Sequence, residues 1–338
     1  MRRERRELMK RVERLRREAG AKSRTEPKVV DVRWEDGTLV IVGGDRSDMS
    51  YFIGPGGYVA GRLREELGLE RVVVQAWTDL RTRLYRLRLA REAVERALKR
   101  APELERILHG IRLERERLRG ERRWDFWEEW EGLEPCGHRI TVAVSGGYDS
   151  TASALILRKL GYEVEPLTVD PGPMILPRKM RENVELLARW LGVEPRFIES
   201  DFSDIVRRSL EEGRIHPCGR CNDRIRRLAV RHAETDVVAF GDGLPTGRHC
   251  VQRDGDRWRL HVPAALAKTK FELRRLVEAE LSGFHEYRYS CPLLHQVHER
   301  HPHLRRASIQ RVLRELRHGF LEVGEALRSI MDILGGEG

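Results

Sequence analysis

The chain has 338 residues, of which 40% are hydrophobic and 35% charged, and its formal net charge is +10. This length predicts two or three domains, and the apolar content is enough for a sizeable core. No apolar run reaches the roughly 18 residues of a membrane span, and the N-terminus, which mixes Arg with Glu, lacks the apolar stretch of a signal peptide. We therefore expect a cytoplasmic protein with no membrane partner.

The basic excess and the dense mixing of Arg and Glu have two interpretations, which do not exclude each other. Neutralising phosphates releases counterions, so a basic chain favours a polyanionic partner. Charges of both signs also suit the surface ion-pair networks of thermophile proteins. Composition alone does not separate the two.

Residues 1–77 predict the element order α-β-β-α-α-β. The expected elements are a charged helix at 1–19, strands at 29–34 and 38–42, helices at 47–53 and 58–67, and a strand at 71–76. Gly54-Pro55-Gly56-Gly57 lies between the two short helices. Glycine lets a nucleic-acid backbone approach closely, and the N-terminus of the following helix can meet a phosphate. The segment resembles a type II KH domain, which implies RNA binding at Gly54, Gly56 and Gly57; a KH-like spacer that binds nothing is the alternative.

Residues 78–134 predict a helical linker or hairpin with a break at Ala101-Pro102. Its apolar positions form only a narrow stripe, so a connection between domains is the preferred interpretation. A coiled-coil contact that makes a homodimer is the alternative. Trp124, Trp127 and Trp130 follow at three-residue spacing and predict a docking face.

Residues 135–338 predict a third domain of α/β class. Strands are expected at 140–144, 164–169, 197–198 and 237–240, with helices at 150–160, 179–191, 203–211 and 222–232. Such alternation implies a doubly wound, mostly parallel sheet with helices on both faces. Ligands bind at the carboxyl ends of such strands, at the topological switch point. Asp170, Gly241 and Asp242 follow strands there and are candidate nucleotide-binding residues.

The most informative motif is Ser145-Gly146-Gly147-Tyr148-Asp149-Ser150, directly after the first of these strands. The glycines allow a tight turn that exposes backbone N–H groups, while Ser145, Ser150 and Thr151 add hydroxyls and the next helix adds its positive end. Together these features predict a cradle for a di- or triphosphate. A carboxylate there would repel phosphates unless a cation lay between them, so Asp149 predicts a Mg²⁺ site. The motif is neither a Walker A loop nor a dinucleotide turn.

This motif resembles the pyrophosphate loop of the PP-loop ATPases. The resemblance implies an adenine nucleotide alpha-hydrolase-like fold, cleavage of ATP between the α and β phosphates, and adenylation of a carbonyl-type oxygen. Tyr148 stands where tRNA-modifying members often have Lys. One phosphate-neutralising charge is therefore missing from the loop or supplied from elsewhere in the chain.

Cysteine usage indicates metal or sulfur chemistry, because an odd count of five in a signal-free chain argues against a disulfide framework. Cys218, Cys221 and the distant Cys291 could ligate a [4Fe–4S] cluster and leave one iron open to bind sulfide or a substrate atom. Zinc held with a histidine is the alternative, with candidates His216, His249, His295, His298, His301 and His303. The histidine run from 295 to 303 is interpreted as a polar, RNA-facing or helix-capping segment.

After the pyrophosphate loop come Cys218-x-x-Cys221 followed by Arg224, Arg226 and Arg227, then Gly241-Asp242-Gly243, the segment 268–273 (Lys-Thr-Lys-Phe-Glu-Leu) and Cys291. This order resembles the cluster-dependent tRNA thiolation enzymes of the PP-loop superfamily, the group of 2-thiocytidine, 2-thiouridine and archaeal-type 4-thiouridine synthetases. The resemblance implies Asp149, Cys218, Cys221 and Cys291 as catalytic residues, with the three cysteines on Fe–S and Asp149 on Mg²⁺. It also implies tRNA as partner, with Arg224 and Arg227 of the basic helix contacting it. The sulfur donor would be inorganic sulfide, a persulfide or a carrier protein. Gly241-Asp242-Gly243 replaces the family's Gly-His-Asn-x-Asp-Asp, so Asp242 stands in for an acidic pair.

We therefore expect an ATP-dependent tRNA sulfurtransferase that uses ATP, Mg²⁺ and a [4Fe–4S] cluster. One alternative is a PP-loop amidating or ligating enzyme with structural Zn²⁺. Another is a non-catalytic RNA-binding protein whose conformation is switched by nucleotide.

Overall fold

The computed structural model describes residues 2–21, 26–35, 37–122, 133–286 and 291–335. The chain forms two compact units, one made of residues 1–85 with 115–126 and the other of residues 86–114 with 127–338. The two helices of the predicted linker, α4 (Trp77–Leu98) and α5 (Glu105–Arg119), contribute to both units and are interrupted at Ala101-Pro102 as predicted. The domain boundaries at 77 and 134 stay predictions, and Trp124, Trp127 and Trp130 lie outside the described residues.

The smaller unit has the predicted element order. Its elements are α1 (Arg2–Glu18), β1 (Val29–Glu35), β2 (Thr38–Gly43), α2 (Arg46–Ile53), α3 (Tyr58–Glu66) and β3 (Arg71–Ala76). Strand β2 is central, antiparallel to β1 and parallel to β3. Leu8, Val12 and Leu15 form one stripe of α1, and they are buried in a cluster that also contains Leu39 and Ile41 of β2. This three-stranded sheet with packed helices agrees with the expected α+β fold, and the KH-like assignment stays a prediction.

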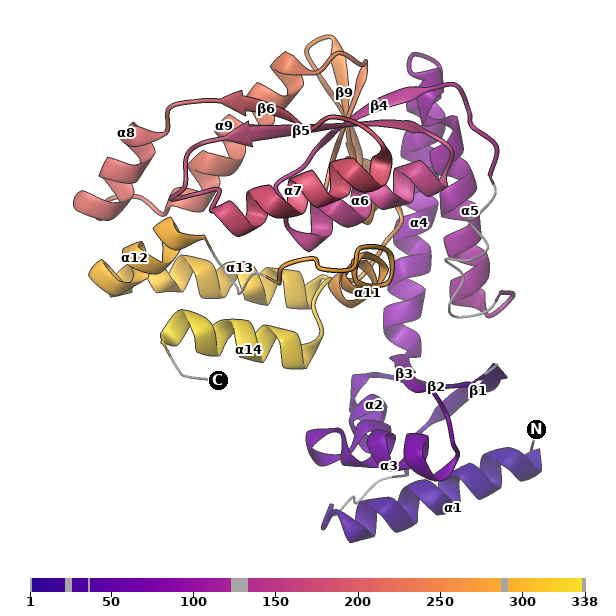
Figure 1. Cartoon of the computed structure of the whole chain (residues 1–338). Helices are drawn as coiled ribbons and strands as arrows, with labels where there is room; N and C mark the ends of the chain where they lie inside the picture. Colours follow the sequence, from indigo (N-terminus) through magenta and orange to yellow (C-terminus); the bar gives the residue numbers. More distant parts are fainter. Residues whose placement is uncertain (1, 22–25, 36, 123–132, 287–290, 336–338) are drawn as a thin grey trace. The chain divides into compact units, whose positions relative to one another are not determined.

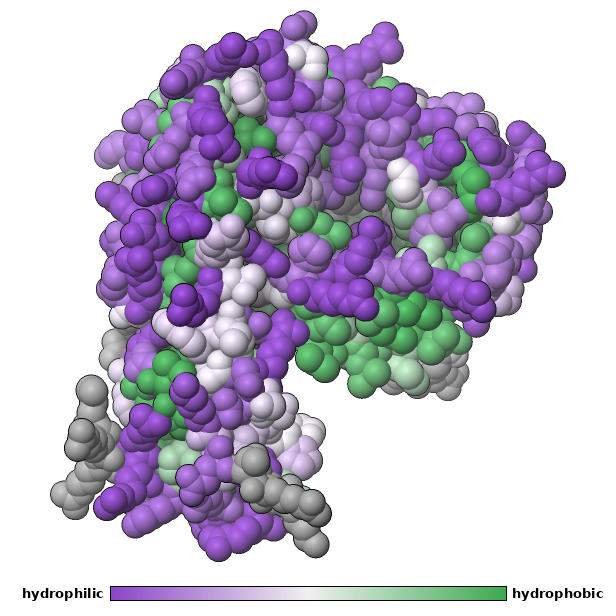
Figure 2. All heavy atoms as spheres, turned by 180° about the vertical axis from the view of Figure 1, so that it is seen from behind, coloured by the Kyte–Doolittle hydropathy of each residue, from purple (hydrophilic) through white to green (hydrophobic). Residues whose placement is uncertain are grey.

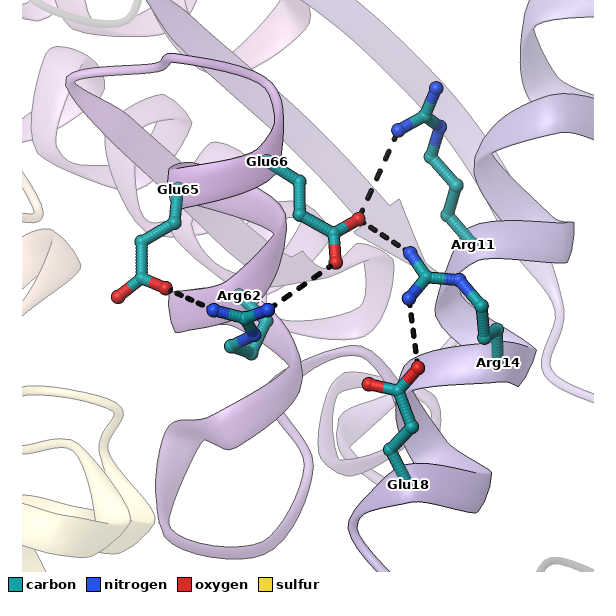
Figure 3. Close-up of polar contacts among 6 residues, drawn as sticks. All are labelled: Arg11, Arg14, Glu18, Arg62, Glu65 and Glu66. Atoms are coloured by element: carbon teal, nitrogen blue, oxygen red, sulfur yellow. Dashed lines mark hydrogen bonds and ion pairs between the residues drawn. The ribbon is translucent and has the colours of Figure 1, made fainter.

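Charged side chains link α1 to α3 in the smaller unit (Figure 3). Arg14 lies 2.5 Å from Glu66 and 2.8 Å from Glu18, and Arg62 lies 2.7 Å from Glu65. Exposed pairs of this kind contribute little one by one and matter mainly where several charges form a network. Part of the dense Arg/Glu content is therefore used within this unit, as the ion-pair interpretation predicts.

The larger unit contains a six-stranded sheet. Its spatial order is β6 (Arg196–Glu199), β5 (Glu163–Asp170), β4 (Arg139–Ala143), β7 (Val237–Phe240), β9 (Arg257–His261) and β8 (Val251–Asp254). All neighbouring pairs are parallel except β8 with β9. The predicted doubly wound, mostly parallel fold is confirmed. Because β5 lies on one side of β4 and β7 on the other, the switch point falls between the ends of β4 and β7.

Helices cover both faces of this sheet. Figure 1 shows α6 (Tyr148–Lys159) and α7 (Arg178–Leu191) along one face. Against the other, α9 (Pro217–His232) packs Ala229 and Val230 onto Leu167, Val238 and Phe240. Eight consecutive residues of α6, from 150 to 157, are buried. The start of α6 is therefore held on all sides, which fixes the loop that precedes it.

The C-terminal part of the larger unit is helical. It comprises α10 (Val262–Ala265), α11 (Lys270–Glu280), α12 (Pro292–Arg300), α13 (Arg305–Arg317) and α14 (Val323–Leu334), and α8 (Ser203–Val206) with η4 (Arg207–Glu211) precedes α9. Helix α11 packs along α6, and α12 packs on η4 and α9. Val323, Leu327, Met331 and Leu334 of α14 are exposed and form an apolar patch, visible in Figure 2. Within the described ranges, every helix is too short or too polar to cross a membrane.

Candidate functional site

The loop between β4 and α6 is held in one conformation. Gly146 has φ +73°, and a Cβ there would overlap the carbonyl oxygen of Met180, so only glycine fits. Asn183 on α7 donates a hydrogen bond to the Gly146 carbonyl at 2.8 Å. The backbone N–H of Ser145 donates to the Ser150 hydroxyl at 3.1 Å. The turn is thus preformed at the N-terminus of α6, where helix geometry favours an anion.

Asp149 lies in this turn beside a lysine from α11. Lys270 Nζ is 3.6 Å from one carboxylate oxygen of Asp149. The other oxygen, Oδ1, is buried and has no hydrogen-bond partner among the described residues. Burial raises the pKa of Asp149, and the Lys270 charge opposes that rise. An orphaned buried carboxylate oxygen next to a phosphate-type cradle fits the hard oxygen ligands that Mg²⁺ prefers.

Tyr148 makes contacts with α11 and its C-terminal flank. Its hydroxyl donates to Glu278 at 3.4 Å, and its ring centroid is 4.9 Å from that of Phe284. Lys270, on the distant helix α11, places a positive charge beside the loop, 3.6 Å from Asp149.

Gly241 and Asp242 follow β7 and meet the same turn. A Cβ on Gly241 would lie 2.5 Å from the backbone nitrogen of Ser150, so the strand end touches the start of α6 directly. Asp242 is 2.9 Å from Arg226 and 3.3 Å from His261 Nδ1. Burial acts to raise the pKa of Asp242, but His261 and Arg226 outweigh it and lower the value to about 2. The carboxylate is therefore ionised and already paired with a cation.

A cavity of about 330 Å³ at this switch point gathers most of the predicted site. Its lining includes Ser145, Asp149, Ser150, Cys218, Cys221, Gly241, Asp242 and Cys291. Leu167, Val169 and Leu176 give it an apolar wall. A second cavity of about 490 Å³ shares Asp149, Cys218 and Asp242 with the first and adds Arg314. The two cavities thus meet at the loop carboxylate and one thiol.

Cys218 and Cys221 lie in the first turn of α9. The helix begins at Pro217 rather than at the predicted residue 222, because proline suits the first helical position. Cys291 is the residue immediately before α12. Burial raises the pKa of Cys218 to about 11 and that of Cys221 to about 12, and it also raises the pKa of Cys291. The nearby charge of Arg311 on α13 opposes the rise at Cys218.

The three thiols fit a cluster better than a single ion. Within the described residues, no three His, Cys, Asp or Glu side chains are arranged to hold one metal ion. Each thiolate of a [4Fe–4S] cluster binds a different iron, so such thiols surround a cavity instead of converging on a point. Cys218, Cys221 and Cys291 line one cavity and interact electrostatically with one another. Three thiols around one cavity are compatible with a cluster.

Four of the six histidines proposed as zinc ligands bond to Ser308 or to backbone carbonyls. His216 and His298 both bond the Ser308 hydroxyl, at 2.8 and 2.9 Å. His301 and His303 donate to the carbonyl oxygens of Leu210 and Gly213. These three residues of the run are thus polar groups bonded to neighbouring segments, and the interpretation of the run as a polar, RNA-facing or helix-capping segment stays a prediction.

Other predicted residues lie outside the cavity. Asp170 bonds Arg181 and the N–H of Gly172 and lines a separate cavity. Gly147 caps α6, and Thr151 is fully buried behind the loop. The nucleotide-binding roles of these residues stay predictions.

Of the residues predicted to contact RNA, the two arginines are paired with carboxylates, whereas two of the glycines have open space beside them. Arg224 makes two hydrogen bonds to Asp204, at 2.6 and 2.8 Å, and Arg227 pairs with Asp223 at 2.8 Å. In the smaller unit, Gly54, Gly56 and Gly57 all have positive φ, and a Cβ on Gly56 or Gly57 would meet open space. Their RNA-binding roles stay predictions.

Sequence reasoning did not assign Lys270, Arg226 or Arg311 to the site. Lys270 and Arg226 belong to motifs that the family resemblance pointed out, so a signal existed. Arg311 lies on a helix with many arginines and nothing local distinguishes it. Only its position on α13, facing Cys218 and both cavities, identifies it.

A Ser-Gly-Gly-x-Asp-Ser loop between the first strand and helix of a parallel sheet, beside the switch point, defines a PP-loop nucleotide-binding unit. No family model matches the chain. A stretch of 118 residues is 36% identical to the tRNA-specific 2-thiouridylase MnmA of Syntrophomonas wolfei, covering 33% of each chain. A similar match, 31% identical over 135 residues, links it to MnmA of Caulobacter sp. and covers 32% of that protein. The chain therefore spans about a third of the length of these thiouridylases, and the predicted resemblance to PP-loop tRNA thiolation enzymes is confirmed.

A longer match is to the uncharacterized protein MJ1638 of Methanocaldococcus jannaschii. The two are 30% identical over 204 residues, covering 58% of this chain and 75% of that one. The chain belongs to the same family as MJ1638. Among solved structures, the U34-tRNA thiolase NcsA from Methanococcus maripaludis with its [4Fe-4S] cluster has a TM-score of 0.35 and 17% identity, covering 60% of this chain and 72% of that one. A TM-score this low adds nothing to the assignment.

Proposed function

We propose that this protein is an ATP-dependent tRNA sulfurtransferase that adenylates a nucleobase carbonyl oxygen and replaces it with sulfur. The observation that carries the proposal is the single cavity that joins the pyrophosphate loop to three cysteines from two distant segments. ATP cleavage alone would need the loop but not the thiols. The similarity to tRNA-specific 2-thiouridylases supports tRNA as the substrate.

The residues of the loop bind and activate the nucleotide. Backbone N–H groups and the N-terminus of α6 bind the phosphates, and Lys270 neutralises part of their charge. Asp149 holds Mg²⁺ through its free oxygen Oδ1, which otherwise would remain buried without a partner. The apolar wall formed by Leu167, Val169 and Leu176 suits the adenine ring.

Cys218, Cys221 and Cys291 hold a [4Fe–4S] cluster, with Zn²⁺ as the alternative metal. A cluster with three protein thiolates supplies one iron at which sulfide can bind. The thiols must lose their protons to bind metal, and their burial opposes this. Arg311 lies beside Cys218 and favours its thiolate form.

The second cavity admits the tRNA base. Arg226, Arg311 and Arg314 line it, and it opens onto Asp149 and Cys218 at the first cavity. A base that enters here must leave its stack, and its carbonyl oxygen then lies between the nucleotide and the thiols. The smaller unit, through its Gly54–Gly57 loop, binds the tRNA backbone as KH-like domains do.

Metal analysis and one cysteine variant test the proposal. Protein purified without oxygen should contain iron and acid-labile sulfide; zinc in their place would favour the amidating or ligating alternative. Cys291→Ala should bind Mg·ATP with unchanged affinity but form no thiolated nucleoside when tRNA, ATP and sulfide are supplied, as read by mass spectrometry of digested tRNA. Thiolation at the wild-type rate by Cys291→Ala would refute the cluster mechanism. ATP turnover to AMP with tRNA present would exclude a non-catalytic RNA-binding protein.

A further inference from the structure

One buried serine joins the two segments that carry the cysteines. The Ser308 hydroxyl, on α13, lies 2.8 Å from His216 Nε2 and 2.9 Å from His298 Nε2. His216 immediately precedes α9, which carries Cys218 and Cys221. His298 lies on α12, which begins directly after Cys291. A single side chain thus connects the two halves of the thiol set.

The same two segments are joined at two further points. His301 Nε2 donates to the Leu210 carbonyl at 2.9 Å, and His303 Nε2 donates to that of Gly213 at 3.2 Å. Gly213 has φ +62°, and a Cβ there would lie 2.5 Å from the His301 ring. The backbone that leads into α9 is therefore packed tightly against the backbone that follows α12.

The Ser308 hydroxyl is buried and bonds both histidine rings. Ser308 is 1% exposed and His298 is 5% exposed. A hydroxyl can donate to one ring nitrogen and accept from the other, so it satisfies two neutral imidazoles at once. Burial lowers the pKa of His298 to about 4, which keeps that ring neutral at physiological pH. Without the hydroxyl, both ring nitrogens would lose this hydrogen-bond partner, and a buried polar group without a partner lowers the stability of the folded state.

We propose that Ser308, bonded to His216 and His298, is a positioning residue that sets the spacing between the Cys218/Cys221 pair and Cys291. The inference rests on the proposed function only in taking these three thiols as one binding set. Neither Ser308 nor His298 lines the two cavities at the site. They act on the thiols by fixing the helices and make no contact with substrate.

A pair of serine variants tests this in the full chain. Ser308→Ala removes the bridge. Ser209→Ala is the matched control, because Ser209 is equally buried and, within the described residues, its hydroxyl bonds carbonyls of its own helical turn, Ile205 at 2.7 Å and Val206 at 3.2 Å. The probe is dibromobimane, a short reagent that joins two thiols, added to metal-free protein; peptide mass spectrometry measures the fraction of Cys291 joined to Cys218 or Cys221. Mg·ATP affinity is measured on the same samples.

Ser308→Ala should lower the fraction of Cys291 joined to Cys218 or Cys221 at least fivefold and leave Mg·ATP affinity unchanged, and Ser209→Ala should change neither. The proposal is overturned if wild-type protein forms no such cross-link, if Ser308→Ala forms it as readily as wild type, or if Ser308→Ala loses the cross-link and Mg·ATP affinity together. If Ser308→Ala does not fold, His298→Leu removes one of the same hydrogen bonds while filling the space and is judged by the same outcomes. Iron and sulfide uptake is measured separately: wild-type protein that takes up no cluster but shows the Ser308-dependent cross-link would refute the proposed function and support the spacing role.

Discussion

At the scale of single residues, the site combines one carboxylate that has a single paired oxygen with another whose two oxygens are both paired. Asp149 has an oxygen without a partner among the described residues, whereas Asp242 is held by Arg226 and His261. Burial raises the pKa of Asp149 and acts in the same direction at Asp242, where His261 and Arg226 outweigh it and lower the pKa. Asp149 is therefore the better candidate for Mg²⁺, and Asp242 is better placed to orient Arg226 toward the second cavity.

Lys270 should carry the charge that the loop lacks at Tyr148. Lys270→Met should raise the dissociation constant for Mg·ATP about tenfold or more, because a hydrogen bond to a charged group contributes about 1.5–3 kcal/mol. Isothermal titration with a non-hydrolysable ATP analogue measures this. Lys99→Met is the control, since Lys99 is exposed on the same unit and lines neither cavity. Equal affinity of Lys270→Met and wild type would show that the loop binds phosphates without this lysine.

At the scale of elements, the sequence predicted those strands and helices whose pattern of apolar residues lies within a short stretch of the chain. Strands β4, β5 and β7 were predictable because buried parallel strands are short apolar runs. The predicted start of α9 at residue 222 was too late, because Cys-Gly-Arg-Cys has no strong helix signal. Pro217 was such a signal, since proline favours the first position of a helix. The β8–β9 hairpin and the helices after 261 were not predicted at all. Lys270 and Arg311 reach the site only through the packing of α11 on α6 and the placement of α13, which no short sequence window contains.

Two glycines in the elements around the site should respond to alanine in opposite ways. Gly146→Ala should lower the free energy of unfolding by about 1–3 kcal/mol or more, because it combines a positive φ with overlap against the Met180 carbonyl. Gly219→Ala should raise it by up to about 1 kcal/mol, because Gly219 lies inside α9 and its Cβ would meet open space.

Denaturant unfolding of metal-free protein measures both glycine changes, and nucleotide titration should show lost binding for Gly146→Ala alone. Equal effects of the two substitutions on stability would mean that the loop is not held against α7 as described.

At the scale of the whole molecule, the chain combines a nucleotide-binding unit with a smaller unit whose element order was predictable almost to the residue. That order was readable because each element of the smaller unit has its own periodicity and each turn its own glycine. An RNA-binding role was harder to predict from charge, because the Arg62 side chain beside the glycine loop pairs with Glu65 and Glu66. A basic net charge therefore does not by itself locate an RNA-binding surface, and the predicted site in this unit rests on the backbone of the loop.

Gly56 allows a direct test of that loop, because its φ is +58° and a Cβ at this position would have no other atom within 4 Å, so a side chain fits there. Aspartate and asparagine both tolerate this left-handed conformation and have nearly the same size. Gly56→Asp should weaken tRNA binding about fivefold relative to Gly56→Asn, since a charge close to a phosphate costs about 1 kcal/mol in water. The difference should shrink as salt rises, because exposed charges are screened. Filter binding at several salt concentrations measures both variants, and equal affinities at low salt would remove the loop from the tRNA interface while leaving the chemistry of the larger unit intact.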